Sequence, residues 1–126
     1  MEQRIKLGLL KDRTIDITTK GRRSGKDRRI EIWFHNVGDK IYITGQPGPR
    51  GWYANMLVNP EIIFHIKQSV LVDIPATCRP ITSNNERRRI FRAIFDKLEG
   101  TRNLNEWTEK SPLVEVELDT KMARFP

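Results

Sequence analysis

Apolar and polar residues alternate along most of the chain, and this period of two predicts β-strands rather than helices. The segments that carry the pattern are 14–19, 28–37, 41–45, 61–67, 70–81 and 113–118. A "GDK" turn joins the second segment to the third, and Gln68 and Ser69 lie at the turn between the fourth and the fifth. We therefore expect two β-hairpins, and links this short favour antiparallel pairing.

Helical spacing of apolar residues is clearest in segment 84–100, for which Asn84 or Asn85 is the expected cap. A shorter helix is expected in segment 51–60, where a proline stops it, and a further helical turn in segment 103–110.

These elements predict a mainly β (α+β) fold in a single domain of residues 1–126. We expect a six-stranded antiparallel barrel with two to three helices. The barrel is expected to be closed or nearly closed, because closure hides the edge strands of a sheet.

The overall charge points to anionic partners. The chain carries 23 Lys and Arg residues against 16 Asp and Glu residues, a formal net charge of +7. Such an excess favours nucleic acid, phosphate-bearing cofactors or an anionic membrane surface.

Cys78 is the only cysteine, which fits a reducing compartment. His35 and His65 are far apart in the sequence, so we expect no metal site. No segment has the pattern of a membrane span or a signal peptide, and we expect a cytoplasmic protein.

The stretch "KGRRSGKDRR", residues 20–29, concentrates positive charge around two glycines. Gly21 and Gly25 allow turns that aim backbone N–H groups at an anion, and arginine donates paired hydrogen bonds to phosphate or carboxylate. Arg28 and Arg29 begin a strand and point to opposite faces, so we expect only one of them to meet the same ligand. A solvated, charged turn is the alternative interpretation.

The stretch "TGQPGPRGWYANML", residues 44–57, places a rigid loop of glycine and proline directly before a helix. A helix N-terminus can hold an anion, so the loop has the logic of a phosphate site, although it matches neither GxGxxG nor a Walker sequence. Trp52 and Tyr53 open the helix, and packing in the core is the alternative role for both side chains.

Taken together, "TTKGRRSGKDRRIEIWF" and "GDKIYITGQPGPRGWYANMLVNPEIIFHI" resemble the deazaflavin (F420)-dependent nitroreductase and quinone reductase family. That family has the split β-barrel fold shared with FMN-binding oxidases. The resemblance implies that the chain binds coenzyme F420, which carries a phosphodiester and a glutamate tail. It assigns cofactor binding to Arg22, Arg23, Ser24, Arg28, Arg29, Ile30, Ile32, Trp33, Thr44, Gly45, Gln46, Pro47, Trp52, Tyr53 and Asn55.

The resemblance also implies a reaction, the transfer of a hydride from reduced F420 to a quinone, a nitro compound or another conjugated acceptor. Such chemistry explains why the sequence has no evident triad, carboxylate pair or metal cluster. Solvent, Tyr53 or His35 would supply the proton. Split barrels of this kind commonly pair, so we expect a homodimer, and the positive charge leaves peripheral association with an anionic membrane open.

Two alternative functions stay open at this point. A split barrel can bind FMN as an oxidoreductase or a flavin carrier, although the surplus of arginine favours F420. A basic β-barrel can also bind nucleic acid by stacking bases on surface aromatics. Trp33 and Tyr42 are the only good candidates for such stacking, so nucleic acid is not the expected partner.

The sequence departs from the family pattern in places. Glu31 stands where the family commonly has proline, and the tyrosines that shape the acceptor site near the C-terminus are missing, with Trp107 as a candidate replacement.

We further expect His65 on a solvent-facing or interface side and Cys78 in the core. The arginines of "ERRRIFRAIF" are expected on the solvated side of their helix.

Overall fold

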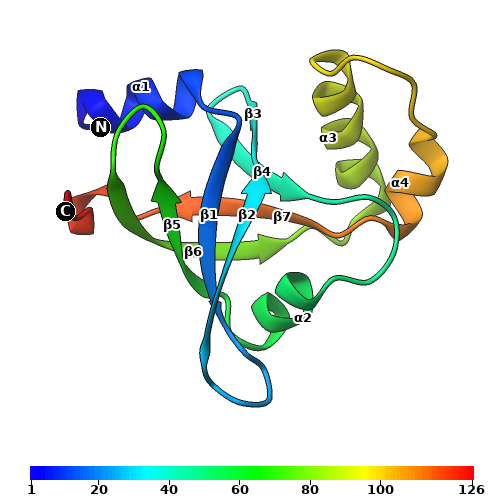
Figure 1. The fold of residues 1–126 in the computed structure, drawn as a ribbon. Coiled ribbons are helices and arrows are strands. Elements are labelled where there is room, and N and C mark those ends of the chain that lie inside the picture. The colour runs from blue at the N-terminus through cyan, green and yellow to red at the C-terminus, as the bar shows by residue number, and fades with distance from the viewer.

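Seven antiparallel strands form one curved sheet in a computed structural model that describes residues 1–126. The strands are β1 (Thr14–Lys20), β2 (Asp27–Trp33), β3 (His35–Val37), β4 (Lys40–Thr44), β5 (Glu61–Ile66), β6 (Val72–Pro80) and β7 (Leu113–Leu118). Their order in the sheet is β2-β1-β5-β6-β7-β4-β3. The sheet curls into a half-barrel (Figure 1), which confirms the predicted mainly β, split-barrel class.

Four α-helices and one 3-10 turn complete the chain. They are α1 (Gln3–Lys11), α2 (Gly51–Val58), α3 (Asn84–Asp96), α4 (Leu104–Lys110) and η1 (Thr120–Met122). Helices α2, α3 and α4 lie in the three predicted segments, and Ser83 rather than an asparagine caps α3. No helix is both long and apolar enough to cross a membrane.

Two hydrophobic clusters hold these elements together. The larger comprises 17 buried residues, among them Ile15, Ile17 and Phe64, which fill the concave side of the sheet. The smaller lies under α3 and includes Phe91 and Ile94. Burial of large apolar side chains of this kind is the main stabilising contribution to a small domain.

The strand count differs from the prediction because the expected strand 28–37 is interrupted. Phe34 turns inward and is 5% exposed, and its N–H donates to the Arg13 carbonyl at 3.2 Å. Residues before Phe34 pair with β1, and residues after it pair with β4. One continuous segment therefore becomes two strands at opposite edges of the sheet.

Helix α1 is the element that the sequence interpretation missed. Glu2 caps it by accepting from the Arg4 N–H at 2.7 Å, and its Ile5 and Leu9 are buried in the larger cluster. Gly8 allows close approach to the sheet, because a Cβ there would lie 2.9 Å from Ile66 Cγ2.

Three expectations about single residues have different outcomes. Cys78 is buried as expected, and burial raises the pKa of its thiol to about 12. His65 is not solvent-facing, because it is only 7% exposed: Nε2 lies 2.7 Å from Thr18 Oγ1, and Nδ1 lies 2.7 Å from Asp73 Oδ1. Arg87 is likewise buried rather than solvated.

The buried Arg87 has a structural explanation. Its guanidinium donates to the carbonyl oxygens of Ile81, Trp107, Thr108 and Ser111. Three of these carbonyls lie at or just beyond the C-terminal end of α4, where a cation interacts favourably with the helix dipole. Arg87 thus joins the start of α3 to the end of α4.

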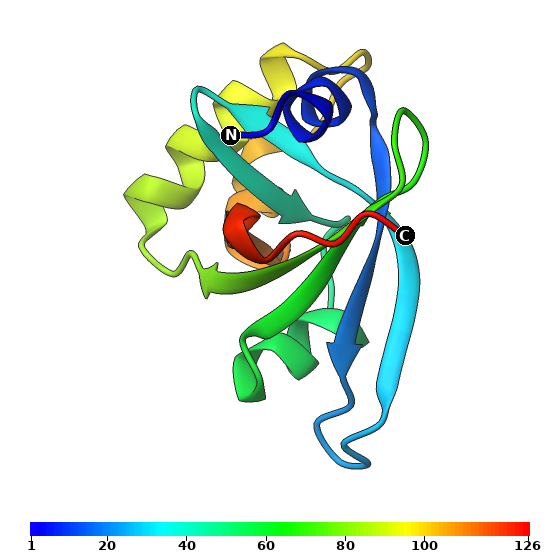
Figure 2. The same cartoon turned by 90° about the vertical axis from the view of Figure 1, so that its left-hand side faces the viewer.

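The hairpin of β1 and β2 projects beyond the rest of the molecule, with α2 beside the half that leads to its tip (Figures 1 and 2). The two strands pair along their full length, from Thr14↔Trp33 to Lys20↔Asp27, so the basic stretch forms the tip of the hairpin. The fold in this way brings the two sequence stretches that suggested a cofactor site to the same end of the molecule.

Candidate cofactor site

The tip of the β1–β2 hairpin is closed by its own hydrogen bonds. The N–H of Gly21 donates to the Lys26 carbonyl at 2.8 Å, and the N–H of Gly25 donates to the Gly21 carbonyl at 2.8 Å. Gly25 has φ +69°, a conformation that favours glycine. A Cβ on Gly21 would lie 2.7 Å from Ser24 Oγ, so any larger residue there would displace the Ser24 hydroxyl.

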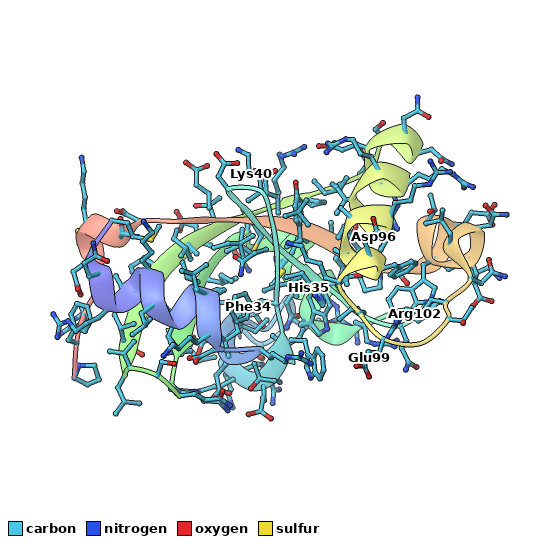
Figure 3. The ribbon with its side chains drawn as sticks, turned by 90° about the horizontal axis from the view of Figure 1, so that it is seen from above. Phe34, His35, Lys40, Asp96, Glu99 and Arg102 are labelled. Atoms are coloured by element: carbon cyan, nitrogen blue, oxygen red, sulfur yellow. The ribbon has the colours of Figure 1, made fainter.

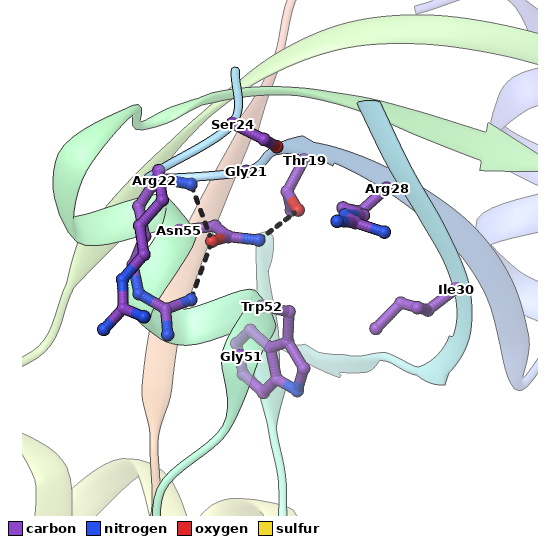
Figure 4. A pocket seen from close by; sticks show the side chains of 10 residues that line it. Thr19, Gly21, Arg22, Ser24, Arg28, Ile30, Gly51, Trp52 and Asn55 are labelled. Carbon is purple, nitrogen blue, oxygen red and sulfur yellow. Dashed lines mark hydrogen bonds between the residues drawn. The ribbon is translucent and has the colours of Figure 1, made fainter. Parts of the chain in front are cut away.

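A cavity of about 480 Å³ lies between this tip, β2 and the first turn of α2. Its lining residues are Thr19, Gly21, Arg22, Arg23, Ser24, Arg28, Ile30, Gly51, Trp52 and Asn55 (Figure 4). None of them is acidic, and the cavity is open to solvent. It is therefore a polar, positively charged recess with a small apolar part.

The three arginines of the cavity have no carboxylate partner. Arg22, Arg23 and Arg28 take part in none of the ion pairs of the molecule. Unpaired guanidinium groups that converge on one recess are well suited to bind phosphate or carboxylate.

Strand β2 divides its predicted ligands between two faces. Arg28 and Ile30 line the cavity. Arg29 lies on the opposite face, where its Nε is 2.9 Å from Asp16 Oδ2. Trp33 is also outside the cavity, 48% exposed and stacked near Arg13, whose Cζ is 5.9 Å from the ring centroid. Ile32 packs against the larger hydrophobic cluster instead.

The start of α2 forms another wall of the cavity. Arg50 occupies the N-cap position without a side-chain capping bond, so no side chain occupies the N–H groups of the first turn. Gly51 and Trp52 line the cavity there. Trp52 also packs against the larger cluster, so this side chain is both part of the cavity wall and a core contact.

Tyr53 faces a different space from Trp52. Its ring meets the Trp52 ring edge to face at 6.0 Å, but it lines a separate cavity of about 680 Å³ together with Pro49 and Arg87. The structure therefore places Tyr53 on the other side of α2 from the arginine-lined cavity.

The loop after β4 approaches the cavity without lining it. Gly45 lies near Trp52, since a Cβ on it would be 3.8 Å from Trp52 Cζ2. Thr44 is buried, and its hydroxyl donates to the Pro112 carbonyl. Gln46 is exposed and Pro47 is half-buried, and neither belongs to the lining.

Asn55 is buried at the back of the cavity, and both of its polar atoms are hydrogen-bonded to protein groups. Its Oδ1 accepts from the backbone N–H of Arg22 at 3.0 Å and from Arg22 Nη1 at 3.1 Å (Figure 4). Its Nδ2 donates to Thr19 Oγ1 at 3.1 Å. These long-range bonds fasten the hairpin tip to α2.

The candidate proton donor His35 lies outside the cavity, in β3 and close to Arg102 (Figure 3). Burial, followed by the charges of Arg102 and Lys97, lowers the pKa of His35 to about 4. The imidazole is consequently neutral near pH 7.

Two aromatics with proposed roles pack on the smaller hydrophobic cluster. Trp107 is half-buried, meets Phe91 and Phe95 edge to face, and is not part of the arginine-lined cavity. Tyr42 is 3% exposed, so of the two aromatics considered as candidates for nucleic-acid stacking only Trp33 is exposed.

The structure is thus a split barrel with an arginine-lined recess, whose donor groups are suited to an anionic ligand. Residues 6–119 match the model of the F420H(2)-dependent quinone reductase family, and the chain belongs to that family. Its cofactor is coenzyme F420, as the sequence predicts, and the protein is an F420-dependent oxidoreductase.

Solved structures with low sequence identity share the fold. A conserved hypothetical protein from Mycobacterium tuberculosis is 13% identical with a TM-score of 0.73, and the match covers 98% of this chain and 82% of that one. An F420 reductase is 13% identical with a TM-score of 0.64 and coverages of 92% and 93%. A structure described as a domain-swapped dimer is 20% identical with a TM-score of 0.59 and coverages of 83% and 80%.

Proposed function

We propose that the protein uses reduced F420 to reduce a quinone or another conjugated acceptor such as a nitro compound, and that the arginine-lined cavity holds the anionic part of the cofactor. The observation that carries this proposal is the set of three unpaired arginines around a recess without any acidic residue. A phosphodiester with a carboxylate tail needs several cations and N–H donors, and the donor set fits that need.

Each lining residue has a defined part in this proposal. Arg22, Arg23 and Arg28 bind the anionic groups, and the free N–H groups at the start of α2 add favourable dipole interactions. Ile30 and Trp52 offer the apolar surface on which a planar ring can pack. The bound cofactor supplies the hydride, so the chain has to bind, orient and partly desolvate the reactants.

No side chain is needed as a proton donor in this scheme. His35 is neutral near pH 7 and outside the cavity, and Tyr53 faces the neighbouring cavity. The recess is open to solvent, so water can deliver the proton that accompanies the hydride.

A titration of the purified protein with F420 and with FMN, at moderate and at high salt, tests the cofactor assignment. Binding of F420 that weakens at high salt, with much weaker binding of FMN, is expected. Preference for FMN would refute the assignment. Oxidation of F420H2, followed by absorbance in the presence of menadione or a nitroaromatic compound, then tests the acceptor class.

We infer that two copies of the chain associate, as split barrels of this kind commonly do. The structural neighbour described as a domain-swapped dimer supports such pairing. Light scattering coupled to gel filtration should give twice the mass of 14.8 kDa. A monomer at all concentrations tested would contradict this inference.

A further inference from the structure

Asn55 is a cavity residue whose carbonyl oxygen is saturated by hydrogen bonds from the protein, and whose amide nitrogen makes one more. It is 6% exposed, whereas the side chains of the hairpin tip are exposed. Its carbonyl oxygen accepts two hydrogen bonds from Arg22, and its amide nitrogen donates one to Thr19. An amide oxygen has two lone pairs, so this oxygen has no free capacity.

The two bonds from Arg22 fix both ends of that residue. One comes from its backbone N–H and sets the path of the loop, and the other comes from Nη1 and sets the direction of the side chain. The remaining guanidinium N–H groups have no hydrogen-bond partner in the protein. One edge of the guanidinium is thus tied down while the other stays available to a ligand (Figure 4).

This arrangement lowers the entropic cost of binding. A free arginine side chain loses rotamer entropy when it is immobilised. An arginine that is already held in place loses less, so its hydrogen bonds contribute more to affinity. Asn55 lies in α2, 33 positions after Arg22, so it joins the hairpin tip to a helix that is distant in sequence.

We propose that Asn55 is a positioning residue that acts on the cofactor through Arg22 and does not itself bind the anion. This proposal rests on the proposed function, which places an anion in the cavity. It predicts that the effect of changing Asn55 depends on the presence of Arg22.

A double-mutant cycle tests this dependence. The dissociation constants of F420 and of inorganic pyrophosphate are measured by titration for wild type, Asn55→Ala, Arg22→Ala and the double variant. We expect each single variant to bind about ten-fold more weakly. The double variant should bind only about two- to three-fold more weakly than Arg22→Ala, because the bond from the backbone N–H of residue 22 is then the only one left to lose. Multiplication of the two effects, to about a hundred-fold, would show an independent role for Asn55 and overturn the proposal.

Two further variants separate positioning from loss of folding. Asn55→Asp keeps both acceptor sites, and the Thr19 hydroxyl can donate to the new carboxylate, so this variant is expected to fold. Its negative charge neutralises Arg22, so weaker binding and a shallower salt dependence are expected. A salt dependence as steep as that of wild type would show that the new charge does not act on Arg22, and would overturn the proposal. Asn36→Ala loses one amide bond, Nδ2 to the Leu9 carbonyl at 2.7 Å, outside the cavity, and should bind normally.

The two probes distinguish failure of this proposal from failure of the proposed function. Wild type that binds pyrophosphate but not F420 would refute the proposed function, and the cycle with pyrophosphate would still decide the role of Asn55. Wild type that binds neither probe would refute both.

Discussion

Replacing Arg28 by alanine should weaken cofactor binding, whereas the same change at its neighbour Arg29 should not. The two residues are adjacent in β2 and point to opposite faces of the hairpin. Arg28 lines the cavity and has no carboxylate partner, whereas Arg29 pairs with Asp16 at 2.9 Å on the outer face. The pair therefore compares the same change at two positions that differ in the face they occupy.

The magnitude follows from the exposure of Arg28. A hydrogen bond to a charged group contributes about 1.5–3 kcal/mol when it is shielded from water. Arg28 is exposed and its interactions are partly screened, so we expect a loss of about 1–2 kcal/mol, or about 5- to 30-fold in the dissociation constant. For Arg29→Ala, loss of an exposed ion pair should cost about 0–1 kcal/mol of stability.

The assay is a titration with F420 at two salt concentrations, accompanied by thermal unfolding of each variant. Arg28→Ala should show a weaker salt dependence than wild type because one cation has been removed from the site. Arg29→Ala should retain wild-type affinity. Equal losses of affinity in both variants would indicate a general effect of net charge and refute the assignment of the cavity.

Three further substitutions and one labelling experiment test other parts of the structure. Gly21→Ala should weaken F420 binding several-fold in the same titration, because its Cβ displaces the Ser24 hydroxyl 2.7 Å away. Trp52→Ala should lower both the affinity and the free energy of unfolding, the latter by about 2–4 kcal/mol, in denaturant titrations. His35→Gln should remove a part of the free energy of unfolding that wild type loses in acid. The pKa of His35 is about 4 in the folded protein and near 6.5 unfolded, so this part, at most about 3 kcal/mol, is present above pH 6.5 and is lost as the pH falls to 4. Cys78 should react with a thiol reagent at pH 8 only after unfolding, because burial raises its pKa to about 12.

Local signals account for the parts of the fold that the sequence analysis predicted correctly. The β3–β4 hairpin follows from a glycine turn, and Gly38 indeed has φ +62°. Helix α3 follows from apolar residues at helical spacing, which bury Ile90, Phe91 and Ile94. Helix α1 lacked such a signal because it buries only Ile5, Gly8 and Leu9 and depends on contact with a distant strand.

The site was predictable where its residues are close in sequence. Arg22, Arg23, Ser24 and Arg28 belong to one hairpin, so the turn alone gathers them. The bonds from Asn55 join segments that only the tertiary fold brings together.

Burial of polar side chains also depended on the tertiary fold. His65 is held between Thr18 and Asp73 on neighbouring strands, and this contact depends on the register of three strands. The alternation of the sequence indicates on which side of β5 His65 lies. It does not reveal the hydrogen-bond partners that allow a polar ring to be buried on that side.

A positively charged segment is ambiguous in sequence, and the partners of each cation resolve the ambiguity in the structure. Lys67 contacts Asp16 and Glu31, and Arg79 contacts Glu86 and Glu115, so the charges of these residues are compensated within the sheet and its neighbouring helix.

Unpaired arginines also occur on α3, where Arg89 and Arg92 project from the helix surface. They differ from the cavity arginines because the recess they line also contains Asp96 and has no glycine turn. The cavity combines unpaired cations, free N–H groups at the start of α2 and an anchored Arg22, and each of these favours an anion independently. Charge alone is common on this protein, whereas the convergence of all three features at the β1–β2 hairpin is the physical reason to place the cofactor's anionic groups there.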